Sequence, residues 1–204
     1  MIIKLDHISY SGKYSDAKSI FNKFIKYDID FEEKDLLNIE CKNELFNETQ
    51  IKHDLYMMKC NNELPIEITL YANCTNDEPM LDVRDKKIFI KSNDPSATEK
   101  LFFDVGFKRK DDYVYLKPIM DNTEVKIYVE PSYSTYNRKL DNFGYSSLAF
   151  WSSNIDKDRE KYHKLGYKVT DIEKLLVNGK ILDIFFLNGN NGEILEFIGV
   201  DKNR

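Results

Sequence analysis

The feature that most constrains this chain is a unit of strand, helix and three strands that recurs along it. Its clearest copy occupies residues 87–130. The helix of this copy begins at Asp94 and Pro95, because Asp is a favoured N-cap and proline at the first helical position leaves no N–H unsatisfied. Gly106 ends the helix, since glycine readily takes the positive φ found past a last turn. Alternating strands on either side of a polar turn at 121–123 complete a βαβββ unit.

The same order of elements occurs twice more. Near the C-terminus, a strand over 145–151 precedes a helix that Asn154 caps and Gly166 ends. A looser copy opens the chain, with a strand over 2–10 and a helix that we expect Ser15 to cap. Because units of this size cannot bury their apolar faces alone, we predict one compact protein rather than independent domains or unrelated α+β stretches. Its three modules occupy residues 1–75, 86–131 and 142–204.

Short phrases within the modules resemble one known family. They are LDHISY (5–10), PIEITLY (65–71), FFDVGF (102–107), YHKLGY (162–167) and GEILEFI (192–198). With the repeated order of elements over nearly the whole chain, they make the protein similar to the vicinal oxygen chelate superfamily. That superfamily includes glyoxalase I, methylmalonyl-CoA epimerase, extradiol dioxygenases and the bleomycin resistance proteins. The resemblance implies an α+β, glyoxalase-like fold, in which βαβββ modules curl their mixed sheets into a cup that contains the active site.

Charge and cysteine content limit the partners that we expect. The net charge is −5 over 204 residues, and acidic and basic residues are mixed along the chain. A nucleic acid or a membrane is therefore not an expected partner, because either one needs a concentrated basic or apolar surface. Three cysteines without C-x-x-C spacing predict neither a disulfide framework nor a zinc knuckle. A polar N-terminus and the lack of a long apolar run predict a soluble, cytoplasmic protein.

Three strand residues are candidates for the chemistry. His7 lies in the middle of the first strand, and Glu67 and Glu196 lie in the last strands of modules one and three. By alternation alone Glu67 faces water, and a buried His7 is a hydrogen-bonded core histidine. Ile194 and Ile198 share a face with Glu196 and favour its burial, although a buried carboxylate is costly without a partner.

The resemblance implies that His7, Glu67 and Glu196 are metal ligands, because the family places its ligands at these strand positions, pointing into the cup. Ser147 stands where a fourth ligand, often histidine, is expected. One imidazole and two carboxylates suit a divalent ion such as Zn²⁺, Ni²⁺, Mn²⁺, Co²⁺ or Fe²⁺. Either glutamate would then be the catalytic base that removes a proton from the substrate.

Two classes of function remain open. The favoured one is a metal-dependent lyase, epimerase or isomerase that stabilises an enediolate-like charge on a small oxygenated metabolite. The alternative is a non-catalytic cup that binds a small molecule, as antibiotic-sequestering resistance proteins do. Convergence of the three candidate side chains would favour the enzyme.

The shared ligand positions also predict how the modules pack. We expect modules one and three to face each other across one cup. Module two has no ligand type at the matching positions, so it packs elsewhere or pairs with its copy in a homodimer. The polar, irregular segment 31–52 is expected to form a long loop over the mouth of the cup, with a strand or short helix inside it.

Overall fold

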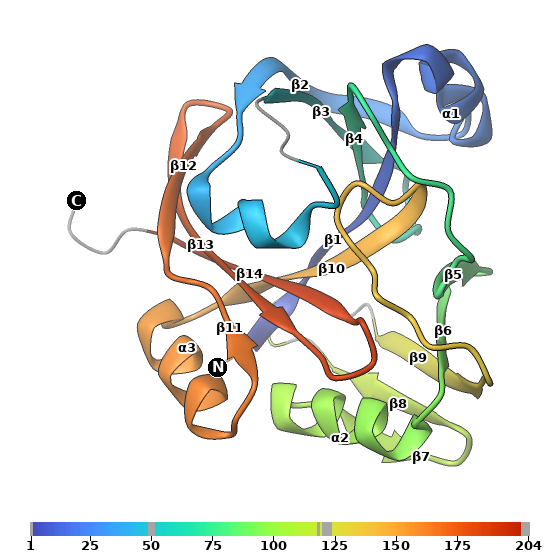
Figure 1. Ribbon diagram of the computed structural model, residues 1–204, viewed down its shortest axis with the longest axis vertical. Coiled ribbons are helices and arrows are strands. Elements are labelled where there is room, and N and C mark those ends of the chain that lie inside the picture. Colours follow the sequence, from blue (N-terminus) through green and yellow to red (C-terminus); the bar gives the residue numbers. More distant parts are fainter. Residues whose placement is uncertain (1, 49–51, 118, 120–123, 201–204) are drawn as a thin grey trace.

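Two curved β-sheets organise the protein, as Figure 1 shows. The computed structural model describes residues 2–48, 52–117, 119 and 124–200, and the turn expected at 121–123 lies outside that part. Within the described residues, the larger sheet has nine strands. They are β1 (Ile2–Lys13), β2 (Asp28–Leu37), β3 (Lys52–Lys59), β4 (Ile66–Tyr71), β10 (Gly144–Ser152), β11 (Lys168–Val169), β12 (Glu173–Val177), β13 (Lys180–Asn188) and β14 (Ile194–Val200). The five strands of the smaller sheet are β5 (Leu81–Arg84), β6 (Lys87–Ser92), β7 (Lys108–Lys110), β8 (Tyr113–Leu116) and β9 (Val125–Pro131).

The larger sheet joins the two ends of the chain. Its strand order is β11-β13-β14-β10-β1-β4-β3-β2, with β12 paired to β13. At its centre β1 pairs antiparallel with β10, so that His7 lies opposite Ala149. Strands from residues 2–71 and 144–200 therefore share one sheet, which is the pairing of the first and third segments that we expected. The smaller sheet, in the order β5-β6-β9-β8-β7, is formed by the middle of the chain.

One topological relation is repeated in all three segments. The first strand of each segment runs parallel to its last strand: β1 to β4, β6 to β9 and β10 to β14. A parallel pair needs a crossover, and the segment's helix lies within it. The predicted α+β class, with repeated βαβββ units and a curled mixed sheet, is confirmed.

The helices of the described residues lie between the first and second strands of each segment, apart from one in the connection after β2. They are η1 (Tyr14–Asp16, 3₁₀), α1 (Ala17–Lys23), η2 (Glu40–Leu45, 3₁₀), α2 (Pro95–Val105) and α3 (Ile155–Lys164). Asp94 and Asn154 cap α2 and α3 as predicted, because each side-chain oxygen accepts a bond from the backbone N–H three residues on. The prediction for Ser15 is wrong. It lies inside η1, and the residue before α1 is Asp16, whose side chain makes no capping bond.

The segment after β2 contains a short helix, which is one of the elements that we expect inside this loop. Its described part contains the helix η2, which lies within the ring of strands of the larger sheet (light blue in Figure 1). Leu45 and Phe46 are buried there against side chains from both halves of that sheet. Their cluster includes Tyr71, Leu175, Val177, Ile184, Phe186 and Ile194. The expected loop over the cup is thus a strand followed by a short helix set into the cup.

The main hydrophobic core lies on the opposite side of the larger sheet. It joins Ile8 and Leu148 of that sheet with Phe102 of α2 and Ile127 of the smaller sheet in one cluster. This shared core holds the two sheets together. The concave side of the larger sheet is not part of this core.

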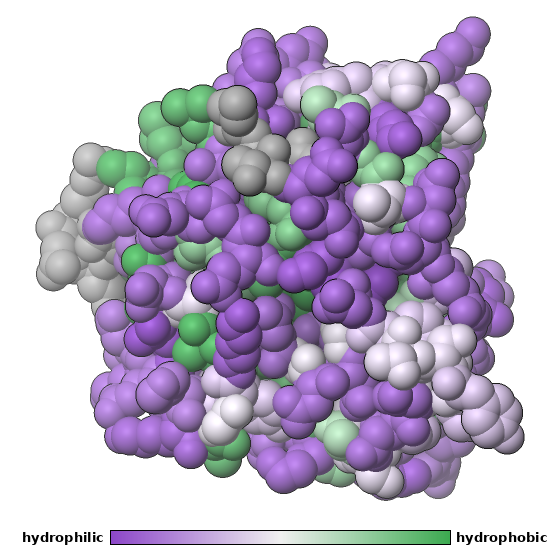
Figure 2. All heavy atoms as spheres, in the orientation of Figure 1, coloured by the Kyte–Doolittle hydropathy of each residue, from purple (hydrophilic) through white to green (hydrophobic). Residues whose placement is uncertain are grey.

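Hydrophilic residues cover most of the face seen in Figure 2, and hydrophobic residues show only in small groups between them. Single exposed apolar groups of this kind are normal for a protein surface. None of the helices in the described part of the chain is long and apolar enough to cross a membrane.

Candidate functional site

The concave side of the larger sheet holds a cavity of about 380 Å³. His7 from β1, Glu67 from β4 and Glu196 from β14 all line it. The strand order β14-β10-β1-β4 explains why residues so distant in sequence meet here. The rest of the wall is mixed, with apolar side chains such as Leu55 and Met57 beside lysines and aspartates.

The imidazole of His7 is the centre of the cluster. Its Nε2 lies 3.4 Å from Oε2 of Glu67 and 3.8 Å from Oε2 of Glu196. His7 is only 2% exposed, and this nitrogen has no hydrogen-bond partner among the described residues. The side chain of Glu67 is 13% exposed, so its carboxylate faces the cavity rather than open solvent. The three residues singled out from the sequence therefore converge.

A β-bulge in β1 sets the direction of His7. The register of β1 against β10 shifts between Leu5 and His7. Leu5 joins the main core, whereas Asp6 and His7 both line the cavity. Strict alternation would place Leu5 and His7 on one face and Asp6 on the other. The bulge prevents this because it adds one residue to the strand and changes the direction of the side chains on either side of it.

The bulge brings Asp6 into contact with the imidazole. Oδ2 of Asp6 lies 2.9 Å from Nδ1 of His7, and the indole N–H of Trp151 donates to Oδ1. Burial raises the pKa of Asp6, but the hydrogen bonds from His7 and Trp151 more than offset this and leave it below its ordinary value. An ionised carboxylate only accepts hydrogen bonds, so Nδ1 carries a proton and Nε2 is directed at the two glutamates.

The surrounding carboxylates favour a positive charge on the side of the imidazole that faces the cavity. Burial lowers the pKa of His7, but Glu67, Asp6 and Glu196 together raise it to about 9. An environment that holds a proton at Nε2 so firmly favours any cation at that position. A proton and a metal ion therefore compete for the same nitrogen.

The two glutamates differ in their surroundings. Ser9 Oγ and Thr69 Oγ1 donate to Oε1 of Glu67 at 3.3 and 3.1 Å, which leaves Oε2 facing the imidazole. Burial raises the pKa of Glu196 to about 7, although the positive charge of Lys42 lowers it. Glu196 is thus the carboxylate better suited to exchange a proton near neutral pH.

Sequence reasoning missed Asp6 and Lys42. Asp6 was missed because nothing in the sequence marks the bulge. Lys42 comes from η2 and lies in a charged stretch between Glu40 and Glu44, a pattern typical of an exposed helix. Ser147, at the expected fourth position, has a buried hydroxyl without a hydrogen-bond partner among the described residues.

The donors fit a divalent metal ion in kind and largely in spacing. Ligands of a tetrahedral ion at ordinary bond lengths lie about 3.4 Å apart. The separation between His7 and Glu67 matches this value, and the one between His7 and Glu196 is wider. Asp6 behind Nδ1 is the carboxylate partner that metal-binding histidines usually have. Even so, in the described part of the chain no group of three or more His, Cys, Asp or Glu side chains is already arranged to hold an ion.

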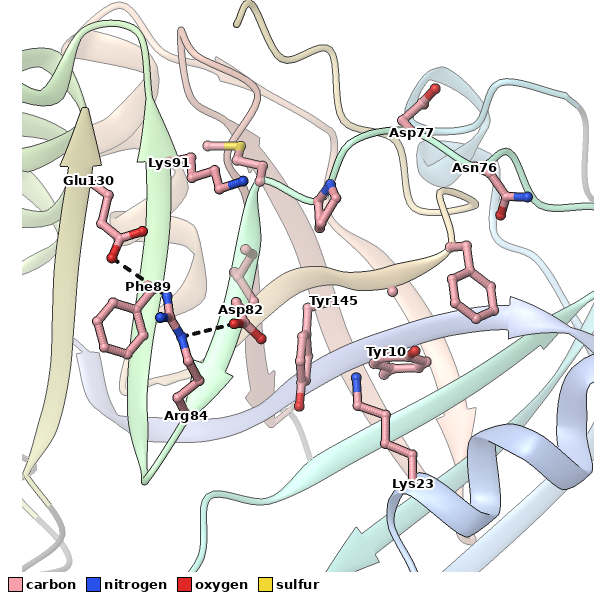
Figure 3. A pocket seen from close by; sticks show the side chains of 15 residues that line it. Tyr10, Lys23, Asn76, Asp77, Asp82, Arg84, Phe89, Lys91, Glu130 and Tyr145 are labelled. Carbon is pink, nitrogen blue, oxygen red and sulfur yellow. Dashed lines mark ion pairs between the residues drawn. The ribbon is translucent and has the colours of Figure 1, made fainter. Parts of the chain in front are cut away.

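A second cavity of about 450 Å³ lies between the two sheets (Figure 3). On one wall, Lys23 Nζ lies 4.8 Å from the ring centroid of Tyr145. On the other, Arg84 stacks on the ring of Phe89 and pairs with Asp82 at 3.0 Å (Figure 3). The charged groups of this cavity thus already interact with aromatic rings or with groups of opposite charge. No histidine lines it, so the convergent donors of the cup have no counterpart here.

Comparisons with known proteins relate the chain to solved structures only. No family model matches it, and no curated protein matches it. Methylmalonyl-CoA epimerase from Mycobacterium tuberculosis is similar over 98% of this chain and 89% of its own, with 11% identity and a TM-score of 0.47. Glyoxalase I from Zea mays is similar over 96% of this chain and 67% of its own, with 12% identity and a TM-score of 0.40. A Bacillus subtilis protein is similar over 98% of this chain, which spans 63% of that protein, at 13% identity and a TM-score of 0.42.

Similarities this low carry no information about the site, whose chemistry rests on the side chains described above. The fold rests on the chain's own topology. Three units of a strand, a helix and three further strands, with the additional strand β12 in the third, build two sheets. In each unit the first strand runs parallel to the last, and the larger mixed sheet curls around a cavity. The protein thus has the glyoxalase-like α+β fold that the sequence predicted.

Proposed function

We propose that the protein is a metal-dependent lyase, epimerase or isomerase that acts on a small oxygenated metabolite. The observation that supports this is the convergence of one imidazole and two carboxylates on a shared cavity. His7, Glu67 and Glu196 would hold a divalent ion, and Zn²⁺, Ni²⁺, Mn²⁺, Co²⁺ and Fe²⁺ all accept these donors. When bound, such an ion supplies Lewis acidity to two adjacent oxygens of a substrate.

The chain's own groups define the movement of the proton. Asp6 fixes the proton on Nδ1 of His7, and so fixes the direction of Nε2. Hydrogen bonds from Ser9 and Thr69 to Oε1 hold the carboxylate of Glu67 with Oε2 toward the imidazole. Glu196 lies further from the imidazole than Glu67 does, so it is the carboxylate that can leave the ion and act as a base. We assign to its carboxylate the removal of a proton from a substrate carbon and the return of that proton to the same or the neighbouring carbon.

The second candidate is a cup that binds a small molecule without catalysis. One specific observation favours it: in the described residues the three donors are not already drawn together around an ion. In that case the cluster would act as a hydrogen-bonding patch for the ligand, with the imidazole as donor and the carboxylates as acceptors.

Metal content of natively purified protein, measured by mass spectrometry, separates these candidates. We expect one Zn, Ni, Mn, Co or Fe per chain in the wild type and less than about a tenth of that in His7→Ala and Glu67→Gln. His163→Ala is the matched control, because His163 is exposed on α3 and lies outside the cavity. A wild-type protein that stays without metal after reconstitution with all five ions would overturn the enzyme proposal in favour of the binding cup.

A further inference from the structure

Lys42 carries a buried ammonium group that lines the same cavity as the acidic cluster. The residue is 8% exposed, and its Nζ lies 5.6 Å from the ring centroid of Phe186. Its side chain makes no hydrogen bond or ion pair with any residue that the structure describes. Lysine is rarely buried this deeply without a partner, because removing a charge from water costs free energy that only an opposite charge or hydrogen bonds offset.

The position of Lys42 is fixed by the backbone of η2. The N–H groups of Glu40 and Cys41 donate to the carboxylate of Glu173 at 2.9 and 2.6 Å. At the other end of the helix, the carbonyl oxygen of Leu45 accepts a bond from the N–H of Leu140 at 2.7 Å. One end of η2 is therefore tied to the third segment, and the other to the connection that precedes it. The structure holds the ammonium in the cup rather than at the surface.

The acids at the rim of the cavity already have other partners. Asp30 pairs with Lys59 at 2.7 Å, and Asp6 bonds His7. Glu196 is the most buried acid of the cluster. It forms no ion pair with Lys42 in the part of the chain that the structure describes. The charge of Lys42 thus acts on Glu196, but its ammonium forms no ion pair or hydrogen bond with an acid among the described residues.

We propose that Lys42 binds an anionic group of the substrate, and that the cup therefore selects small oxygenated metabolites that carry a carboxylate. This specifies the substrate class of the proposed enzyme. It rests on the proposed function only in taking this cavity as the substrate site. A carboxylate accepts the ammonium hydrogens directly and restores the charge balance that burial of Lys42 demands.

The half-buried Lys4 and the exposed Lys180, which also line the cavity, add to the attraction. Lysines near the entrance raise the local concentration of anions and so the rate at which they arrive. They do not provide the buried contact, so a rim lysine serves as a matched control for Lys42.

Trp151 offers a direct measurement, because it is the one tryptophan of the chain and lines this cavity. We would titrate its fluorescence with lactate and with lactamide, which have the same shape and differ in charge. Natively purified wild type, Lys42→Met, Lys42→Gln and Lys180→Met would be compared, with the metal content of each sample measured in parallel. We expect lactate to bind the wild type at least about tenfold more tightly than lactamide, since hydrogen bonds to charged groups are the strong ones. Lys42→Met and Lys42→Gln should abolish that preference, and Lys180→Met should keep it within about twofold.

Equal affinity of the wild type for lactate and lactamide would overturn the proposal without the use of any variant. A lactate preference that survives in both Lys42 variants would overturn it as well. Metal content separates this outcome from failure of the proposed enzyme. A protein that lacks metal but prefers lactate through Lys42 supports an anion-binding cup and not the metalloenzyme. A protein that holds metal but shows no such preference keeps the metal site and loses the anionic substrate class.

Discussion

Nδ1 of His7 lies 2.9 Å from Oδ2 of Asp6, although the two residues are neighbours in one β-strand. In a regular strand their side chains would point to opposite faces. The bulge between Leu5 and His7 turns both toward the cup. The candidate site therefore depends on one irregularity of β1 as much as on the identity of its residues.

Asp6→Asn tests this contact. An amide accepts the bond from Nδ1 only weakly and with no negative charge, so Nε2 becomes a poorer and less well oriented ligand. We expect metal affinity to fall by about 10–100-fold with little change in folding. Competition with a chelator of known affinity measures the change. Asp30→Asn is the matched control, because Asp30 lines the same cavity and pairs with Lys59 instead. Equal metal affinity in Asp6→Asn and wild type would rule out the orienting role.

Glu196→Gln tests the protonation of the buried carboxyl in metal-free protein. Burial raises the pKa of Glu196 to about 7, against 4.5 as the ordinary value. Between these values the folded state binds a proton that the unfolded state lacks, so the contribution of Glu196 to stability is lost as pH rises through 7. The glutamine is always neutral. We expect it to gain ~1–3 kcal/mol on the wild type between pH 5 and pH 8, as measured by urea unfolding with a chelator present.

Glu160→Gln is the control for that series, because Glu160 is exposed on α3. Its stability relative to the wild type should be nearly the same at both pH values. If the stability of Glu196→Gln relative to the wild type were also the same at pH 5 and pH 8, the folded protein would keep this carboxylate ionised.

Much of the fold could be predicted from local signals. Asp94 and Asn154 are caps that act within three residues, so their helices follow from short-range chemistry. Ser15 failed because a 3₁₀ turn precedes α1, and the choice between such a turn and a helix is decided by packing. The pairing of β1 with β10 joins residues 133 to 150 positions apart. It could be expected only from the repeat and from the positions of His7 and Glu196.

The candidate site divides in the same way. His7, Glu67 and Glu196 could be identified as candidates because each is a polar residue among apolar neighbours in the middle of a predicted strand. Asp6 depends on a bulge, and Lys42 depends on where η2 docks. Both are consequences of tertiary contacts for which the neighbouring residues carry no signal.

Glu173→Gln tests the docking of η2. Burial and the nearby charge of Glu173 raise the pKa of Cys41 to about 12, which keeps its thiol unreactive at pH 8. The glutamine removes that charge and one of the acceptors for the N–H groups of Glu40 and Cys41. We expect alkylation of Cys41 by iodoacetamide to accelerate by about tenfold or more, as followed by peptide mass spectrometry. Cys60 in the same molecule is the internal reference. Unchanged alkylation of Cys41 relative to Cys60 would mean that Glu173 does not hold the helix in place.

His53→Phe tests the cost of a histidine buried beside the cup. Both ring nitrogens of His53 are buried without a partner among the described residues, and its ring lies 5.7 Å from that of Tyr71. Burial and then the charge of Lys42 lower the pKa of His53 to about 3. Below the ordinary value of 6.5 the unfolded chain binds a proton that the folded chain does not, so stability falls as pH falls from about 6.5 toward 3. The limit for one group is about 1.4 kcal/mol per pH unit.

Phenylalanine fills a similar space against Tyr71 and cannot be protonated, so His53→Phe should lose less stability than the wild type between pH 7 and pH 5. We expect the difference to reach ~1–2 kcal/mol, which is the linkage limit over that interval. Urea midpoints at the two pH values give it directly. His163→Phe is the control, because His163 is exposed on α3. Since acidic groups contribute equally to wild type and variant, only the difference between the two proteins reports His53. Parallel pH profiles for wild type and His53→Phe would show that the folded protein supplies the imidazole with a proton-stabilising partner, such as bound water.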